Sequence, residues 1–450
     1  MTRVLWCLGA LALVLCAGPA LAALEGKTPD AGNFIGPIGV VTGEEIKSSE
    51  DKQESMASEK EAGFLRFFRR EDLTFIPLPA FAYNRNERYW AGGLMPILKT
   101  NPRGEITDLV APQYLYNQFV GHNGSLNYYG YRSDTAQYHA VVSYAEKVER
   151  TIDLSYKDLG AGGGRYIIWA DGAWFKNPFA RFFGLGNNSK ESNESNYTSR
   201  ETNLKLAGGI NLSPDLSILI TERYRDVRLD NGVVPSLPQT TTAFSTTAGV
   251  EGAQIFGTKL TFFYDTRDSQ LTPVKGRYLN LSGEFNTNVQ HAAPNRWLRF
   301  TLDARQLIPH DSDRKVLILR FLADGVMRTD ETLRRTIPFY ERPMLGGENT
   351  LRAFGLNRFF SDTAWLVNVE ERMQIAEKRV FDHNVDLQVA PFVDMGRVQR
   401  LDRHSFSFEH MQVNPGVGFR VLARPYVVGR LDAAYGKDGG NVFVGLDYPF

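Results

Sequence analysis

Residues 345–360 read LGGENTLRAFGLNRFF, and the interpretation of the whole sequence starts from this stretch. Its three glycines, Gly346, Gly347 and Gly355, allow the backbone to turn tightly. Between them, Arg352 is flanked on both sides by apolar residues. Apolar flanks gain nothing on an exposed loop, but they are buried if the loop folds back into a cavity. We therefore expect this loop to enter a cavity, where Arg352 meets a buried anion.

Two acidic residues downstream are candidates for that anion. Glu370 ends the run LVNVE at 366–370, and Asp394 lies in the run PFVDMG at 391–396. Both runs are short, rich in β-branched or aromatic residues, and typical of strands. The alternative interpretation is a glycine-rich surface turn beside two unrelated acids.

The loop and the two acids together resemble the bacterial surface antigen family, the barrel of the BamA- and TamA-like outer-membrane insertase and transporter superfamily. In that family a long loop with an (L/V/I)RG(F/Y) tip enters the barrel. Its arginine pairs with an acid on the next strand and with the aspartate of a following D-x-G strand. The resemblance implies that Arg352 pairs with Glu370 and Asp394 in the lumen. Ala353 stands where the family has glycine, and alanine disfavours a positive φ, so the tip can differ in shape.

Most of the chain alternates short apolar runs with turn residues. Hydrophobic residues make up 43% of the sequence, yet no stretch after the N-terminal leader is apolar for long enough to span a bilayer as a helix. In 259–264, 278–285 and 316–324 the apolar residues fall on one face of a strand. This pattern is typical of a transmembrane β-barrel, with one side in lipid and the other in water. A soluble β-sandwich alternates in the same way, but it rarely needs so many long strands.

The nine strands predicted at the C-terminal side are the most regular part of the pattern. They lie near 257–266, 276–286, 295–308, 315–328, 363–376, 386–398, 412–422, 424–436 and 441–450. The first half can be divided in several ways, which gives between sixteen and eighteen strands in total. The resemblance implies sixteen. We therefore expect an all-β, transmembrane antiparallel β-barrel of sixteen strands with a long loop folded into the lumen.

The N-terminal 72 residues divide into two segments. Residues 1–22 have a basic start, an apolar run and the small-residue end Ala20-Leu21-Ala22, which predicts a secretory signal peptide. Residues 23–72 are predicted to be a polar linker, in which 57–72 can form a short helix. They are too few for a periplasmic repeat domain of the family. The barrel is expected over 73–450. Both cysteines, Cys7 and Cys16, lie in the signal peptide, and acylation of Cys16 is the alternative to its removal.

Polar stretches predict the loops and turns between the strands. Residues 187–203 and 230–247 are expected to be long surface loops, because outer-membrane barrels carry their long loops on the outside. The run Asp265-Thr266-Arg267-Asp268, followed by Pro273 and Gly276, resembles a periplasmic turn of the family, tied by Arg267 to a neighbouring acid. The run FFGLGN at 182–187 resembles a second family stretch, more weakly.

The C-terminal residues alternate regularly. Val442, Val444, Leu446, Tyr448 and Phe450 form an apolar row that ends on an aromatic residue. This row resembles the recognition strand by which barrels are delivered to the barrel assembly machinery. Such a strand can add to an exposed sheet edge through backbone hydrogen bonds. The alternative is an ordinary terminal strand.

The composition offers little support for catalysis or for nucleic-acid binding. The 51 basic and 51 acidic residues balance, so no nucleic-acid partner is expected. The seven histidines are scattered without the spacing of metal ligands, and no nucleophile elbow or phosphate loop is present. We expect no metal, no cofactor and no enzymatic activity. A catalytic site assembled from distant strands would show no such local motif.

Three functional hypotheses follow for a protein of the bacterial outer membrane, in contact with its lipid. The first is an insertase or transporter that places or moves a client protein or lipid, with a weak seam between the first and last strands. The second is a passive or plugged pore of the same fold. The third is a structural or adhesive barrel whose outer loops bind a partner.

Overall fold

The computed structural model describes residues 69–70, 72–75, 77–101, 106–133, 135–269, 272–290, 295–311, 314–328, 336–380, 383–401, 408–423, 426–445 and 448–450. The predicted signal peptide and residues 23–68 of the predicted linker lie outside this range. The linker was predicted to reach residue 72, with a possible short helix over 57–72, of which 57–68 lie outside the described residues. Arg69–Arg70 form the short strand β1, which pairs with Leu73 and Thr74.

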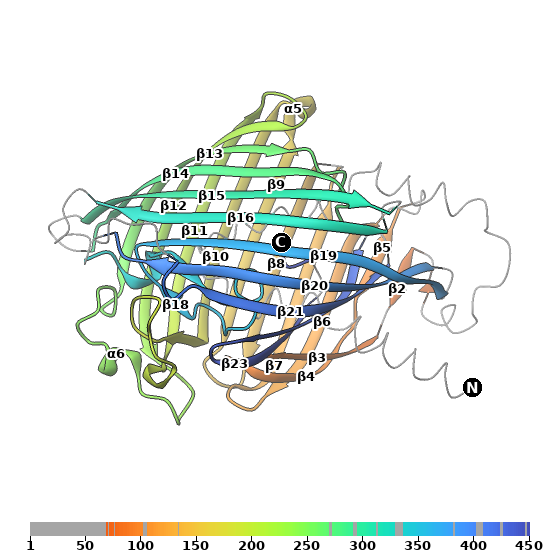
Figure 1. Ribbon diagram of the computed structural model, residues 1–450. Coiled ribbons are helices and arrows are strands. Elements are labelled where there is room, and N and C mark those ends of the chain that lie inside the picture. The colour runs from red at the N-terminus through yellow and green to blue at the C-terminus, as the bar shows by residue number, and fades with distance from the viewer. Residues whose placement is uncertain are drawn as a thin grey trace.

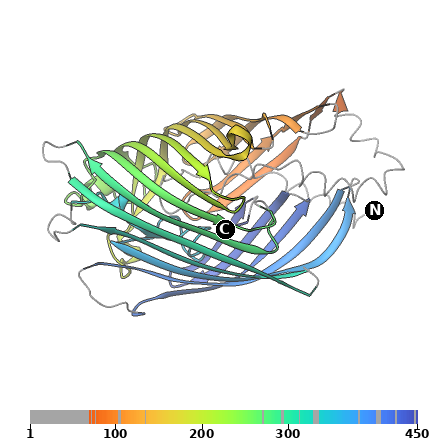
Figure 2. The same ribbon diagram turned by 90° about the horizontal axis from the view of Figure 1, so that it is seen from above.

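Long antiparallel strands form the wall of a barrel, and they run obliquely around it (Figures 1 and 2). In chain order they are β2 (Leu73–Phe75) with β3 (Leu78–Asn84), β4 (Arg88–Leu94) with β5 (Ile97–Thr100), β6 (Ile106–Asn117), β7 (Gly121–Tyr131), β8 (Ala136–Ala145), β9 (Arg150–Gly160), β10 (Tyr166–Phe182), β11 (Ser195–Asn211), β12 (Leu216–Asn231), β13 (Ala253–Asp265), β14 (Gly276–Asn288), β15 (Asn295–His310), β16 (Lys315–Met327), β19 (Thr363–Val380), β20 (His383–Gln399), β21 (Gln412–Ala423), β22 (Tyr426–Gly436) and β23 (Gly439–Gly445).

The described residues form 18 wall strands when β2–β3 and β4–β5 are each counted as one interrupted strand and the two-residue β1 is left aside. The predicted number of sixteen was therefore wrong, whereas the nine C-terminal strands lie close to where they were predicted, except that the last of them ends at Gly445 and not at residue 450. The ambiguity lay in the first half. There β6, β7, β8 and β9 follow one another through turns of only a few residues. Such short turns carry few of the glycine and proline signals that separate strands in a sequence.

The two faces of the wall differ as a membrane barrel requires. On β14, Leu279, Leu281 and Phe285 are exposed on the outside, whereas Asn280 and Glu284 are buried inside. The same inversion holds on the strands before and after it, with an apolar exterior and a polar interior. A soluble sandwich would bury the opposite face, so the pattern confirms the predicted lipid-facing barrel. Within the described part of the chain, no helix is long and apolar enough to cross a membrane.

The barrel closes where its first and last strands meet. β3 and β23 lie side by side, and Val444 packs against a cluster that contains Ala80 and Ala82. Every other neighbouring pair of long wall strands forms an antiparallel ladder, but the described residues show no ladder register between β3 and β23. A strand edge without ladder hydrogen bonds is the weakest junction in a β-wall. We call this junction the seam.

The chain end does not continue along the wall. β23 ends at Gly445, Leu446 lies outside the described residues, and the C-terminus lies within the ring of strands in both ribbon views (Figures 1 and 2). Tyr448 donates a hydrogen bond from Oη to Gln388 Oε1 at 2.9 Å, and the guanidinium of Arg372 lies 3.4 Å from the centroid of its ring. The prediction of one continuous row through residue 450 was therefore wrong for Tyr448 and Phe450.

Phe450 has a specific place in the lumen. Its ring packs beside Leu307, Val316 and Ile318, and Arg320 lies 5.3 Å from the ring centroid. Apolar packing together with a cation above an aromatic face stabilises this inward position. The alternating pattern could not reveal it, because a strand residue and a lumen residue can both be aromatic.

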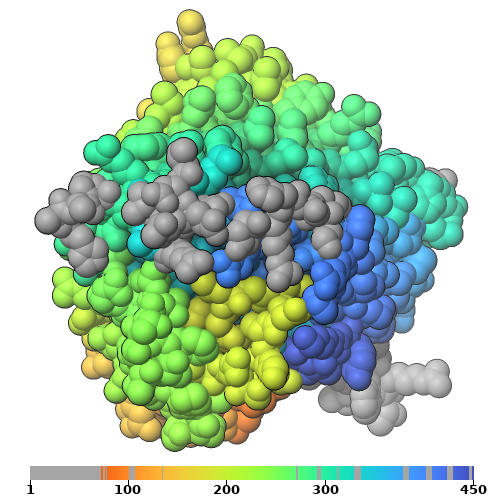
Figure 3. Space-filling view, turned by 60° about the vertical axis from the view of Figure 1, so that its left-hand side comes forward, coloured from red at the N-terminus to blue at the C-terminus, as the bar shows by residue number. Residues whose placement is uncertain are grey.

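The connecting loops pack together over one end of the barrel. They contain the short elements η1 (Glu191–Asn193), α6 (Thr240–Ala243) and η2 (Phe339–Glu341), whereas α5 (Ala161–Gly164) lies at the other end. Figure 3 looks toward the loop end, where atoms of the β10–β11 and β12–β13 connections cover much of the surface. Beneath them is an apolar cluster formed by Phe182, Tyr197, Val227, Ala253, Ile255, Trp297, Val326, Ile337, Phe339, Tyr340, Met344 and Phe360.

The predicted surface loop at 187–203 was wrong in its second part. Residues 195–203 belong to β11, and the polar side chains of Ser199, Glu201 and Asn203 are buried inside the barrel, whereas Asn196 is buried under the β12–β13 connection, where it donates to the backbone oxygens of Leu237 and Pro238. In a soluble protein such a polar run indicates a loop. In a barrel it can equally line the interior of the wall.

Candidate functional site

The connection between β16 and β19 folds back into the lumen. Two short strands, β17 (Met344–Leu345) and β18 (Phe359–Phe360), pair at its base. Residues 346–358 between them form a narrow hairpin-like segment that we call the tongue. Gly346 and Gly347 have φ angles of 119° and 107°, which residues with a side chain rarely adopt. Gly355 is needed for close packing and not for a positive φ angle, because a Cβ atom there would lie 2.4 Å from Asn86 Oδ1.

The apolar flanks of the tongue are fully buried. Leu351, Ala353 and Phe354 are 0% exposed and pack against wall residues such as Phe392. Ala353 does not have a positive φ angle, so alanine fits the tip without strain. It lies close to β22, since a Cβ atom added to Gly436 would be 2.8 Å from the Ala353 side chain. The burial explains why a loop would carry apolar residues beside a cation.

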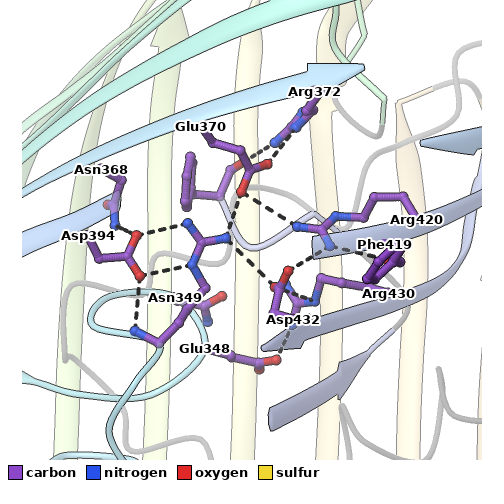
Figure 4. Close-up of polar contacts among 12 residues, drawn as sticks. Glu348, Asn349, Asn368, Glu370, Arg372, Asp394, Phe419, Arg420, Arg430 and Asp432 are labelled. Atoms are coloured by element: carbon purple, nitrogen blue, oxygen red, sulfur yellow. Dashed lines mark hydrogen bonds and ion pairs between the residues drawn. The ribbon is translucent and has the colours of Figure 1, made fainter. Parts of the chain in front are cut away.

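Arg352 lies where the sequence predicted it, between Glu370 and Asp394, the two acids that are labelled in Figure 4. Its Nε and Nη2 donate to the two carboxylate oxygens of Asp394 at 3.0 and 2.8 Å, and Nη1 donates to Glu370 Oε2 at 2.6 Å. The backbone N–H of Arg352 also donates to Asp394, at 3.1 Å. Below the guanidinium, the ring centroid of Phe392 is 3.2 Å away. Asn368 orients Asp394 by donating to its Oδ1 at 2.7 Å.

Ion pairing outweighs burial at Arg352. Burial disfavours the charged guanidinium, but Asp394 and Glu370 hold the pKa of Arg352 above its ordinary value. The side chain therefore stays charged, and both carboxylates receive donors from it. Removing one partner of a buried ion pair is strongly destabilising, because the other charge is left buried without a partner. Replacing both partners by apolar residues often changes the stability much less. The arrangement is suited to holding the tongue in one position.

The ionic contacts extend beyond this pair along β19 to β22 (Figure 4). Glu370 also accepts from Arg372 Nε at 2.9 Å and lies 3.5 Å from Arg420 Nη2. Arg420 Nη1 is 2.6 Å from Asp432 Oδ1, and Arg352 Nη1 is 3.8 Å from Asp432 Oδ2. Arg372 and Arg420 therefore hold the carboxylates of Glu370 and Asp432 through contacts that do not involve the tongue.

Three further contacts tie the tongue to other strands. Glu348 pairs with Arg430 of β22, and the backbone oxygen of Asn349 accepts from Arg320 of β16 at 2.6 Å. Asn441 of β23 donates to the backbone oxygens of Arg352 and Phe354 at 3.3 and 3.1 Å. The last strand beside the seam is therefore bonded directly to the tongue.

A second ionic cluster holds the same loop at its N-terminal side. Glu341 is 0% exposed, and Arg223 donates to both of its carboxylate oxygens at 3.2 and 3.0 Å. Arg225 Nη1 donates to Glu341 Oε1 at 2.6 Å. The two arginines are held in turn by Glu284 and Glu201, at 2.8 and 3.0 Å.

Sequence reasoning missed this second cluster. A signal was available, because Arg223 and Arg225 are two residues apart on β12 and so face the same side of the wall. Two adjacent cations inside a barrel require buried anions. Nothing in the sequence, however, identified Glu341 as the anion, since it lies 118 residues from Arg223.

The two other family-like stretches also have defined places. Arg267 is tied to Asp265 by two hydrogen bonds of 2.9 and 2.8 Å, which confirms the predicted turn. In the stretch at 182–187, the N–H of Gly186 donates to the backbone oxygen of Phe360 at 2.7 Å. The ring of Phe183 lies 4.2 Å from the guanidinium of Arg358. That stretch therefore packs against the end of the tongue.

Comparisons with known proteins agree with this geometry. The model of the Omp85 superfamily domain matches residues 117–441. The structure is similar to BamA from Haemophilus ducreyi lacking POTRA domains 1–3, with a TM-score of 0.51 and 12% identity, covering 85% of this chain and 76% of that chain. CdiB from Acinetobacter baumannii is matched with a TM-score of 0.41 and 12% identity, over 83% of this chain and 59% of that chain. No curated protein matches the sequence. Because the matched domain spans well over half of the 450 residues, the chain belongs to the Omp85 superfamily.

Proposed function

We propose that this protein is a bacterial outer-membrane barrel that inserts or moves polypeptides or lipids, and that its tongue keeps the barrel closed until the tongue moves. Membership of the Omp85 superfamily supports the class of function. The observation that carries the proposal is the link between tongue and seam. Asn441 bonds the tongue to β23, and β23 has no described ladder to β3.

The tongue can control the seam through the strands that it holds. Arg352 pairs with acids on β19 and β20, and Glu348 pairs with Arg430 on β22. These strands belong to the part of the wall that leads to β23. While the tongue is in place, it braces them from the inside. If the tongue withdraws, Asn441 loses two acceptors, and the last strand is held mainly by its ladder with β22.

A plugged state is favoured over an open pore. The tongue is buried in the lumen, and the loop end is packed by the apolar cluster around Phe339 and Phe360. Aromatic residues packed in this way exclude water. We therefore propose narrow, fluctuating conductance for the resting protein. A passive pore of the same fold remains the second candidate function.

We also propose outer-membrane lipid and the barrel assembly machinery as partners. Val442 and Val444 lie on the strand that would be recognised, but Tyr448 is bonded to Gln388 in the lumen of the folded barrel. Recognition of the C-terminal row would then take place before folding is complete. The proposal assigns no catalytic role and no cofactor.

A disulfide between tongue and wall tests the proposal. Ala353→Cys and Gly436→Cys would place two Cβ atoms about 2.8 Å apart, about 1 Å closer than the usual spacing in a disulfide, so the tongue must move back by about that distance for the bond to form. The Cβ atom at 436 would also lie 2.5 Å from Asn414 Nδ2, so the Asn414 side chain must turn away. In proteoliposomes, the reduced double variant should speed the insertion of a urea-unfolded barrel protein. The oxidised variant should not, and reductant should restore the rate. Equal insertion with and without the wild-type protein, together with a steady wide conductance, would reject an insertase in favour of a pore.

A further inference from the structure

The outer surface of the first strands has a hollow of about 580 Å³. It is lined by Pro77, Pro79, Gly93, Leu94, Met95, Pro112, Gln113 and Tyr114, which come from the β2–β3, β4–β5 and β6 region. Its size falls within the range of small-molecule sites, about 300–1,000 Å³. These strands precede residue 117, where the superfamily match begins. The hollow is therefore a feature of the unmatched part of this chain.

The hollow faces the lipid and not the lumen. Tyr114 is 56% exposed and Met95 is 38% exposed, whereas their neighbours Leu94 and Gln113 are buried. Strand residues alternate between the two faces, so Pro112 lies on the same outer face as Tyr114. The lining that faces outward is thus proline, glycine, methionine and tyrosine. Gly93 leaves space where the other strands carry a side chain.

Prolines create the hollow by interrupting the ladder on adjacent strands. The N–H of Met95 donates to the backbone oxygen of Pro112 at 3.0 Å, but Pro112 has no N–H with which to return the bond. Pro96 also lacks an N–H group. Its nitrogen faces the strand on the other side of β4–β5, which is the interrupted strand β2–β3. The breaks between β2 and β3 and between β4 and β5 lie at this level.

A polar group lies at one end of the hollow. Tyr114 Oη is 2.5 Å from His122 Nδ1, and Tyr116 packs against the same imidazole at 5.2 Å between ring centroids. All three side chains are on the outer face, near the turn that joins β6 to β7. Exposed aromatic residues near the strand ends mark the level of the lipid headgroups in a membrane barrel.

We propose that the hollow is a binding site for one acyl chain of a membrane phospholipid, with its headgroup beside Tyr114 and His122. The occupant follows from the environment, since an apolar depression on the lipid-facing wall is filled by hydrocarbon. The hollow is wide and open to the bilayer, so a bound chain would lie along it beside the outward-facing prolines. The site lies beside β3, so a retained lipid would border the seam.

A client strand fits this surface less well than an acyl chain. An added strand needs free N–H and C=O groups along an edge. Six of the eight lining residues lie on or beside β4 and β6, which are each paired on both sides, and only Pro77 and Pro79 lie on or beside β3 at the seam. The oxygen of Pro112 already accepts from Met95, and Pro96 and Pro112 offer no donor. An acyl chain requires no hydrogen bonds.

Photolabelling tests the proposal. The protein is reconstituted with a phosphatidylethanolamine that carries a diazirine near the middle of one chain, irradiated, and mapped by peptide mass spectrometry. Labelling at Met95 and Tyr114 should exceed labelling at Leu126 several-fold. Leu126 is a suitable reference because it is 49% exposed and pairs with Pro112, so it lies at the same depth on regular wall.

Two glycine variants separate a bound lipid from bulk lipid. Gly93→Phe fills the hollow and should reduce labelling there to the level of Leu126. Gly208→Phe is the matched control, because Gly208 is exposed on the outer face of β11, has open space around its Cβ position and lies on a strand that does not line the hollow. It should leave the labelling unchanged. If Gly93→Phe does not fold, competition by unlabelled phosphatidylethanolamine must remove the excess over Leu126. Equal labelling at all three positions, equal loss in both variants, no competition, or cross-links to a second copy in place of lipid would each overturn the proposal.

Discussion

The loop between β16 and β19 is held at two places by ion pairs of opposite polarity. At the tip anchor, the loop supplies one cation, Arg352, and the wall supplies the acids Glu370 and Asp394. At the shoulder anchor, the loop supplies one acid, Glu341, and the wall supplies two arginines of β12. Both loop residues are almost completely buried. The wall therefore offers anions to the cationic end of the loop and cations to its anionic end.

Opposite polarity restricts where the loop can lie. If the loop slid so that Arg352 approached β12, it would meet Arg223 and Arg225 in a low-dielectric interior. If Glu341 approached β19, it would meet Glu370. Like charges brought together in such an environment repel strongly. The two anchors therefore favour a single register of the loop, and an intermediate position satisfies neither anchor.

The anchors differ in what remains when the loop residue is removed. Without the Arg352 side chain, Asp394 keeps two neutral donors, the amide of Asn368 and the backbone N–H of residue 352, but no cation, whereas Glu370 keeps Arg372 and Arg420. Without Glu341, Arg223 still has Glu284 and Arg225 still has Glu201. At Asp394 the tip anchor depends on one cation, whereas every charged residue of the shoulder anchor keeps an ionic partner. We expect mutations at the tip to have the larger effects.

Arg352→Ala should have the largest effect. It leaves the buried carboxylate of Asp394 without a cation, and breaking a buried pair in this way costs about 3–5 kcal/mol. Water in the lumen would reduce the figure. Urea unfolding of the refolded barrel and its heat-modifiable migration on gels would measure the loss, and limited proteolysis would show whether the tongue is released.

Arg352→Lys is the control for charge at the tip. Lysine keeps the positive charge but cannot donate to Asp394 through two parallel N–H groups, so it should recover part of the stability. Wild-type stability and tongue protection in Arg352→Ala would contradict the tip anchor. The same would hold for Asp394→Ala.

Glu341→Gln should have a smaller effect. The amide keeps the shape and one acceptor, while the arginines retain Glu284 and Glu201, so we expect a loss of about 1–3 kcal/mol. The same unfolding assay would measure it. If Glu341→Gln destabilised the barrel more than Arg352→Ala, the difference in compensation between the two anchors would be refuted.

The contrast between the anchors also explains what the sequence could predict. Arg352 and its acids belong to short segments with recognisable order, so the pairing could be inferred before the structure. Glu341 has no such motif, and its partners lie on β12, far away in sequence. Contacts of this kind depend on how the strands close into a ring. A local sequence pattern does not predict which distant strands that ring brings together.

The errors in the wall have a similar physical origin. Alternation predicted the lipid-facing residues, because the hydrocarbon selects apolar side chains at every second position. The lumen selects only for polarity, so residues 195–203 could not be told from a loop. At the chain end, Tyr448 and Phe450 are apolar enough for the wall. They lie in the lumen because Arg372 and Arg320 offer their rings a cation there.

Combining both variants tests whether the anchors are independent. They share no residue, so the losses in Arg352→Ala/Glu341→Gln should add to within about 0.5 kcal/mol. A double variant that loses clearly less than the sum would mean that releasing one anchor already releases the other. A double-mutant cycle from four urea-unfolding curves would measure this coupling.

The smallest effect on the loop should come from pH, because the groups concerned are in neither anchor. Glu87 and Glu149 lie in turns at the loop end of the first hairpins, and burial raises the pKa of each carboxyl from 4.5 to about 7. Trp90 Nε1 donates to Glu87 at 2.8 Å. The folded state thus binds more protons than the unfolded state between pH 4.5 and about 7. The stability that these groups contribute is complete below pH 4.5 and falls as the pH rises through 7.

Hydrogen exchange at several pH values, corrected for intrinsic rates, would follow this loss in peptides covering 84–92 and 144–152. Glu87→Gln keeps an acceptor for Trp90 but cannot ionise, so it should remove part of the pH dependence in the first peptide. The tongue should show little change over the same range, since its anchors do not include these turns. Opening of the tongue in parallel with the turns would show that the loop end and the tip anchor unfold as one unit, and the two anchors would then have to be treated as parts of a larger cooperative structure.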